Sequence, residues 1–149
     1  MTAYEYFRRA EAVEATSAEI YECLARRFVG NGGAAATFRE LAQEERQHAS
    51  RIRLMGRRHA AARQLFEGMP RLEEELAEME ALAQRALDEV RLDVWGQDLA
   101  AVHARLAALE DRLTTHAEYM ARGTDPDLRA FFEALAEQDR AHRRIFEDR

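Results

Sequence analysis

The feature that most restricts the fold of this chain is an acidic residue in the middle of the hydrophobic stripe of each of four predicted helices. Apolar residues recur along these segments at alternating spacings of three and four, as in helices packed in a bundle. The acids on the stripes are Glu14, Glu45, Glu110 and Asp139. In two of the segments a histidine, His48 or His142, follows the acid by three residues. The pattern predicts six polar side chains that point into one helical core.

Four buried acids need a compensating positive charge. An unpaired carboxylate in a low-dielectric interior is very costly, whereas a folded domain is stable by only about 5–15 kcal/mol. No Lys or Arg falls on the four stripes. Two divalent cations would balance four carboxylates, and two imidazoles would complete a mixed oxygen and nitrogen ligand set. The stripes therefore predict a site for a pair of metal ions.

Caps and helix breakers divide the chain. Of 149 residues, only seven are Gly and two are Pro, so few points interrupt the helical pattern. Thr2 with Glu5 forms a capping box, and Asp98 and Asp125 are further N-cap residues, the latter followed by Pro126. We expect four helices, over residues 2–29, 34–67, 98–122 and 126–149. The acidic segment 71–90 is helix-forming, and we expect it to be a connection rather than part of the core.

The chain also repeats itself, which indicates how the helices are joined. Residues 38–48, FRELAQEERQH, align with residues 132–142, FEALAEQDRAH, at an offset of 94. A weaker match at an offset of 96 relates the segments that begin with Glu14 and Glu110. Two duplicated antiparallel hairpins joined by a long connection form a four-helix bundle with one crossover. We therefore predict a single all-α domain over residues 1–149, with the crossover at 71–97.

Composition narrows the possible partners and location. The net charge is −6 and all 22 basic residues are scattered arginines, so we expect no nucleic acid partner. No segment reaches the roughly 20 apolar residues of a membrane span, and the N-terminus lacks a signal-peptide pattern. The single cysteine, Cys23, excludes an internal disulfide and a cysteine-rich metal site, and we expect it to be a packing residue. The expected location is the cytoplasm, with no membrane contact.

These motifs resemble the rubrerythrin branch of the ferritin-like superfamily. The resemblance rests on Glu14 seven residues before Tyr21, on LAQEERQH, on Glu110 and on LAEQDRAH. It implies a ferritin-like bundle in which two helices each give one carboxylate and two give an acid with a histidine. Carried over position by position, the metal ligands are Glu14, Glu45, His48, Glu110, Asp139 and His142.

The same resemblance implies a cofactor and a reaction. The centre would hold two iron ions, or alternatively iron with manganese, or zinc. It would react with dioxygen or hydrogen peroxide as a peroxidase, an oxidase or a ferroxidase. No rubredoxin-like domain is expected in this sequence, so electrons would come from a separate donor.

Three departures from the family pattern qualify these expectations. Asp139 stands where Glu is usual, and its shorter side chain favours a less symmetric centre. Rubrerythrin proper carries an additional glutamate at the position of Ala107, so the peroxide-type ligand switch of that subgroup is not expected. A short fifth helix after the bundle, as in cage-forming ferritins, is also not expected, which favours a homodimer or another small assembly over an iron-storage cage.

Several polar residues have two possible roles. Tyr21 is either an accessory radical or proton relay near the centre, or a core residue with a bonded hydroxyl. His103 is either an accessory ligand or, as we favour, a hydrogen-bonded core residue. Glu44 is either solvated or in contact with a ligand from outside. We expect His59 and His116 at the surface or at its edge.

Two other functions also fit the pattern. The chain could be a non-enzymatic metal-binding or helical interaction scaffold, with an inert or structural metal site. It could also be a metal-free bundle that acts through protein contacts. Elemental analysis would separate the second of these from the metal-binding alternatives.

Overall fold

The helices of the chain have the following bounds in a computed structural model, which describes residues 1–62 and 66–147. They are α1 (Ala3–Arg27), α2 (Gly32–Arg58), α3 (Leu72–Arg91), α4 (Leu99–Gly123) and α5 (Pro126–Glu147). Four of them, α1, α2, α4 and α5, correspond to the predicted bundle helices. The all-α fold class is confirmed.

Side-chain caps start three of these helices where the sequence predicts them. The Thr2 hydroxyl accepts a 3.1 Å bond from the Glu5 N–H, while the Glu5 carboxylate accepts a 2.9 Å bond from the Thr2 N–H. Asp98 and Asp125 accept backbone N–H bonds of 3.1 and 3.0 Å in the first turns of α4 and α5. The caps satisfy N–H groups that have no partner within the helix and so fix where each helix begins.

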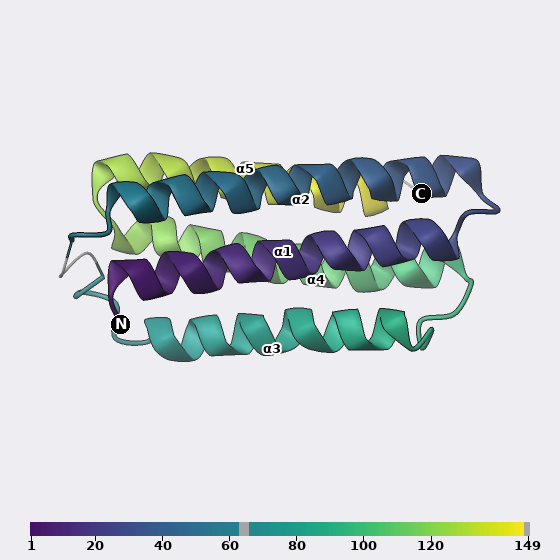
Figure 1. Cartoon of the computed structure of the whole chain (residues 1–149), viewed down its shortest axis with the longest axis horizontal. Helices are drawn as coiled ribbons and strands as arrows, with labels where there is room; N and C mark the ends of the chain where they lie inside the picture. The colour runs from purple at the N-terminus through teal and green to yellow at the C-terminus, as the bar shows by residue number, and fades with distance from the viewer. Residues whose placement is uncertain (63–65, 148–149) are drawn as a thin grey trace.

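Two antiparallel hairpins form the body of the fold (Figure 1). Helix α1 pairs with α2, and α4 pairs with α5. Helix α3 joins the two hairpins along one side of the bundle, so α2 and α4 run in the same direction (Figure 1). The predicted bundle of two hairpins with one long crossover is confirmed.

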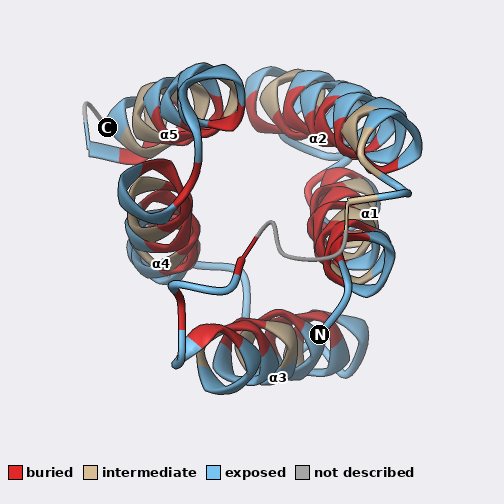
Figure 2. Cartoon of the chain, turned by 90° about the vertical axis from the view of Figure 1, so that its left-hand side faces the viewer, coloured by how far each residue is buried: buried red, intermediate tan, exposed pale blue. Residues whose placement is uncertain are grey.

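The crossover helix belongs to the core, contrary to the expectation for residues 71–90. One face of α3 is buried, including Leu76 and Met79, and it packs against α1 and α4. Figure 2 shows this buried face turned inward. The acidic face also has partners, because Arg9 pairs with both Glu73 and Glu80. Helix α3 is amphipathic despite its many acidic residues, and its apolar face covers one side of the bundle.

The second bundle helix is shorter than predicted. Helix α2 ends at Arg58, whereas the sequence pattern predicts a helix over residues 34–67. Beyond the end of α2, the ring of Phe66 is buried and its centroid lies 4.9 Å from that of the Tyr6 ring on α1. A straight continuation of α2 would carry Phe66 away from the bundle, so burial of this ring favours a turn after α2. Residues 63–65 of the predicted helix lie outside the described part of the chain.

Aromatic layers close the core on both sides of its polar middle. Toward one end, the rings of Phe7 and Phe132 stack at 6.3 Å. Toward the other end, the ring of Tyr21 lies 6.4 Å from that of Phe38 and 6.2 Å from that of Phe146. The four acids on the stripes therefore lie between two layers of aromatic side chains, which separate them from bulk water at the two ends of the bundle.

Within residues 1–62 and 66–147, no helix combines the length and the apolar character that crossing a membrane requires.

Candidate metal centre

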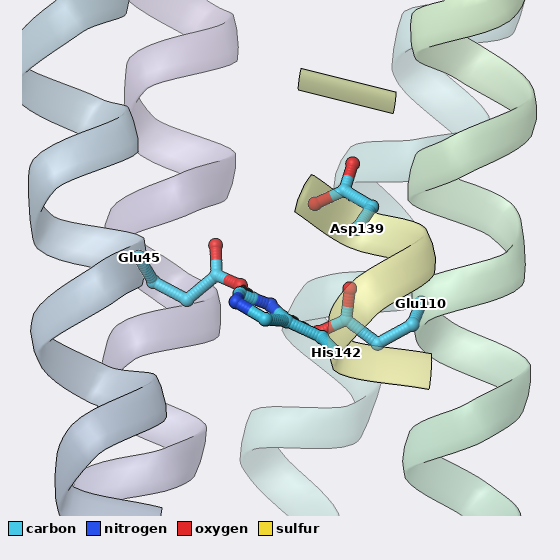
Figure 3. Close-up of side chains that lie close together, drawn as sticks. All are labelled: Glu45, Glu110, Asp139 and His142. Atoms are coloured by element: carbon cyan, nitrogen blue, oxygen red, sulfur yellow. Dashed lines mark ion pairs between the residues drawn. The ribbon is translucent and has the colours of Figure 1, made fainter. Parts of the chain in front are cut away.

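The six residues predicted as ligands meet in the middle of the bundle. Helix α1 contributes Glu14 and α4 contributes Glu110. Helices α2 and α5 each contribute an acid and a histidine. All six are buried, and the most exposed of them, Glu14, is only 7% exposed. Figure 3 shows Glu45 of one hairpin extending toward the ring of His142 of the other, with Glu110 on the far side of that ring.

The six side chains form two overlapping groups, each able to hold one metal ion. Within each group the potential ligand atoms lie within 4.8 Å of one another. The larger group consists of Glu45, Glu110, Asp139 and His142, and the smaller one of Glu14, Glu45 and His48. Because Glu45 belongs to both groups, it would contribute to holding both ions.

Both histidines turn the same ring nitrogen toward the acids. Nδ1 of His142 lies 3.0 Å from Oε1 of Glu45 and 3.4 Å from Oε1 of Glu110. Nδ1 of His48 lies 3.5 Å from Oε2 of Glu45 and 3.8 Å from Oε2 of Glu14. The two rings are nearly parallel, at 12°, with centroids 5.6 Å apart. A metal pair would therefore be met by two Nδ1 atoms from adjacent, parallel rings.

In each of the six residues, at least one inward-facing atom forms no hydrogen bond of normal geometry with any described residue, although Nδ1 of His142 and Oε1 of Glu45 lie only 3.0 Å apart. The buried atoms without such a bond are Glu14 Oε2, both oxygens of Glu45, Nδ1 of His48, Glu110 Oε2, Asp139 Oδ1 and Nδ1 of His142. Buried polar atoms in folded proteins are almost always satisfied, and exceptions require an explanation. Carboxylate oxygens and imidazole nitrogens that face one another in this way fit divalent metal ions once their protons have been displaced.

Burial and mutual repulsion raise the pKa values of three of the four acids. Removal from water is the largest cause for Glu14, Glu110 and Asp139, and neighbouring carboxylates add to it. The pKa values of Glu14 and Asp139 lie well above the ordinary range. Without metal, this environment disfavours the charged form and so favours the protonated forms of Glu14 and Asp139.

For the two histidines and Glu45, contacts with neighbouring groups outweigh the effect of burial on the pKa. Burial alone would lower the pKa values of the imidazoles, but contacts with the acids offset it and raise that of His48 to about 10 and that of His142 to about 12. Burial would raise the pKa of Glu45, but contacts with Glu14 and the two histidines lower it. Protons therefore supply the positive charge in the metal-free core. A metal pair would have to displace them, since metal ligands bind in their deprotonated forms.

Two residues that are not predicted ligands, Glu44 and Tyr21, form hydrogen bonds to residues that are. Nε2 of His142 lies 2.5 Å from Oε2 of Glu44, whose side chain is 52% exposed. This contact settles the position of Glu44: it touches a predicted ligand while remaining at the surface. The Tyr21 hydroxyl donates a 2.5 Å hydrogen bond to Oε1 of Glu110. Tyr21 is thus a core residue with a bonded hydroxyl that also touches the centre.

An opening between α2 and α5 leads to the histidine side of the centre. It has a volume of about 260 Å³, and its lining includes both histidines, Glu44 and Gln138. Peroxide, dioxygen and metal ions are all small compared with this volume. The opening therefore brings solvent and small solutes to the outer side of the two imidazole rings.

His116 lies in the interior, which corrects the expectation that it is at the surface or at its edge. It is only 5% exposed. Its Nε2 lies 2.8 Å from the Tyr6 hydroxyl, and its Nδ1 lies 3.5 Å from a carboxylate oxygen of Glu75 on α3. Helix α3 covers this histidine, and the sequence pattern did not indicate this because α3 was not expected in the core.

A small internal cavity separates this histidine from the centre. It has a volume of about 20 Å³, and Tyr6, His116, Glu14 and Asp139 are among its lining residues. That is space for about one water molecule. The other two histidines lie away from this cavity's lining. His103 is buried and its ring packs against those of Phe38 and Phe146, whereas His59 is partly buried.

Comparison with known proteins assigns the family. The Rubrerythrin family model matches residues 5–149, which is nearly the whole chain. No curated protein and no solved structure matches this chain. The match agrees with the bundle of two hairpins and with the carboxylate and histidine clusters that could hold metal. The chain belongs to the rubrerythrin family.

Proposed function

We propose that this protein binds two metal ions, iron in its working form, and reduces hydrogen peroxide or dioxygen with electrons from a separate donor. The observation that carries the proposal is the set of inward-facing ligand atoms without hydrogen bonds, contributed by all six residues. The family assignment supports iron as the metal. The one cysteine in these 149 residues cannot form a cysteine-ligated electron-transfer site, so the electrons would come from a donor outside this bundle.

The chain's own residues would each have a defined task. Glu110, Asp139 and His142 would hold one ion, Glu14 and His48 the other, and Glu45 both. Glu44 would keep the proton of His142 on Nε2, which leaves Nδ1 free to bind metal. A bound iron pair supplies two electrons and Lewis acidity. Reduction of hydrogen peroxide to two water molecules takes up those two electrons and two protons.

The surrounding structure would control access to the reaction. The aromatic layers exclude bulk water from the ends of the site, whereas the opening between α2 and α5 admits small oxidants. Tyr21 would hold one oxygen of Glu110 by its hydrogen bond and leave the other free. The centre would thus react with small molecules that pass the two histidines and exclude larger organic ones.

The test starts from metal-free protein, because zinc can occupy such a site during purification whatever the native metal is. Anaerobic addition of Fe(II) should reach two ions per chain. Addition of peroxide, or of oxygen in a parallel sample, should then produce ferric absorption in the near ultraviolet. A Glu45→Ala variant should lose both ions, while Glu40→Ala, on an exposed position of the same helix, should behave as the unmodified protein.

The alternatives predict different results. Two tightly bound ions that react with neither oxidant would contradict the redox proposal and support a metal-binding scaffold. Absence of stoichiometric iron, manganese and zinc would contradict both and leave a bundle that acts through protein contacts. Measurement of bound metal before and after the oxidant is added therefore separates the three.

A further inference from the structure

The internal repeat places a carboxylate beside one half of the centre and an amide beside the other. At the offset of 94 residues, Glu45 corresponds to Asp139 and His48 to His142. The residue before each acid does not keep its charge, because Glu44 corresponds to Gln138. Both residues line the opening between α2 and α5. The two halves of the centre thus have related backbones and different chemical surroundings.

Glu44 makes a contact that Gln138 does not reproduce. Its carboxylate lies 2.5 Å from Nε2 of His142 on the opposite hairpin. The side-chain oxygen of Gln138 is buried and has no hydrogen-bond partner among the described residues. A carboxylate that accepts the outer N–H of a ligating imidazole orients the ring and makes its inner nitrogen a stronger donor. A neutral amide forms a weaker hydrogen bond and gives less of this effect.

The ligand groups differ in the same direction. The group on the His142 side contains three carboxylates, from Glu45, Glu110 and Asp139, together with the imidazole. The group on the His48 side contains two carboxylates, from Glu14 and Glu45. Additional carboxylate oxygens strengthen the binding of hard divalent cations. Both the number of ligands and the support behind the histidine therefore favour the same position.

We propose that the two metal positions are unequal, that the position at Glu110, Asp139 and His142 fills first, and that Glu44 is the positioning residue responsible for part of the difference. This inference rests on the proposed function, in that it takes the centre to bind two ions. Loss of such an outer partner typically weakens metal binding about 10- to 100-fold. An ion bound alone would then occupy the side of the centre formed by α4 and α5.

The probe is Co(II), added in steps to metal-free protein without oxygen. Visible absorption follows occupancy, and paramagnetically shifted, exchangeable N–H signals in the proton NMR spectrum report each ligating imidazole. A His48→Gln variant identifies which of the two signals belongs to His48. We expect two binding steps, with the His142 signal complete after the first equivalent and the His48 signal developing with the second.

Glu44→Gln should lower the Co(II) affinity of the first step by about 10- to 100-fold, so that the affinities of the two steps become more alike. It should also speed exchange of the His142 N–H with water. Glu40→Gln removes the same charge from an exposed position of α2 and should leave both steps unchanged. Denaturation midpoints of the metal-free variants, expected to agree, separate positioning of the ring from a general loss of structure.

Three results would overturn the inference. They are equal affinities for the two ions, a His48 signal that appears first, and a Glu44→Gln variant whose first step and N–H exchange match those of the unmodified protein. Absence of any Co(II) binding has a different meaning, because it would contradict the proposed function itself.

Discussion

The Tyr21 hydroxyl donates a 2.5 Å hydrogen bond to Oε1 of Glu110, joining α1 to a carboxylate of α4 in the interior of the bundle. Both side chains are fully buried. In Tyr21→Phe, this oxygen of Glu110 would have lost its donor inside a low-dielectric core. We expect the free energy of unfolding of the metal-free protein to fall by about 1–3 kcal/mol, measured by urea denaturation. Tyr4→Phe, on an exposed position of the same helix, should change it little. Equal losses in the two variants would show that the Glu110 bond has no specific effect.

Glu14→Gln should separate folding from metal binding. Burial raises the pKa of Glu14 well above its ordinary range, which favours the neutral acid in the metal-free protein. Glutamine has nearly the same shape and no charge, and it should leave the urea midpoint of the metal-free form almost unchanged. It is, however, a poor metal ligand, so the second bound ion should be lost. Elemental analysis after metal loading checks the stoichiometry.

Metal should stabilise the unmodified protein more than this variant. At a free zinc concentration of 100 times Kd, each filled site adds about 2.7 kcal/mol to the free energy of unfolding. The urea midpoint of the unmodified protein should therefore rise on addition of zinc, and the rise should be smaller in Glu14→Gln. An equal rise in both would place the ions somewhere other than this centre.

His116 should remain neutral through most of the acidic range. Burial is the main cause that lowers its pKa from 6.5 to about 4, although Glu75 acts in the opposite direction and Arg112 adds to the lowering. The unfolded chain binds a proton near pH 6.5 that the folded protein does not accept until about pH 4. The stability gained from keeping this imidazole neutral is present above pH 6.5 and is lost as the pH falls toward 4, by about 3 kcal/mol in all.

An NMR titration of the imidazole resonances of metal-free protein measures this directly. The His116 signals should move with a midpoint near pH 4. A proton on Nδ1, which lies 3.5 Å from a carboxylate oxygen of Glu75, would let Nε2 accept from the Tyr6 hydroxyl 2.8 Å away, and the nitrogen shifts report this tautomer. A midpoint between pH 6 and 7 would mean that α3 does not cover this side chain in solution.

Gly56 should tolerate no side chain. A Cβ at this position of α2 would lie 2.8 Å from Cβ of Phe7, which is too close for two carbon atoms. We expect Gly56→Ala to reduce the free energy of unfolding by about 1–3 kcal/mol, because overpacking would push α1 and α2 apart. Gly33→Ala in the same helix meets only a side-chain oxygen of Asn31, at 3.8 Å, and should be neutral or stabilising by up to about 1 kcal/mol. Thermal denaturation of the two variants checks the difference, and similar midpoints would contradict the close approach.

The sequence by itself determined the helices of the bundle and the acids in their stripes. Both depend on local spacing: caps such as Thr2 with Glu5 fix helix starts, and a period near 3.6 residues fixes which side chains share a face. The same spacing predicts that Glu45 is buried, and burial of a carboxylate without a counter-charge costs free energy. Local spacing was therefore enough to name six candidate ligands, and the folded chain brings all six together.

Only the tertiary structure decided the contacts between segments far apart in the chain. Glu44 reaches His142 because the two hairpins lie against each other with a particular rotation, which the sequence of neither helix specifies. His116 is buried because α3 lies across it, and α2 ends at Arg58 while Phe66, further along the chain, packs beside Tyr6. Each of these outcomes depends on the free energy of packing between elements, whereas the periodicity of a sequence records only which face of an element is apolar.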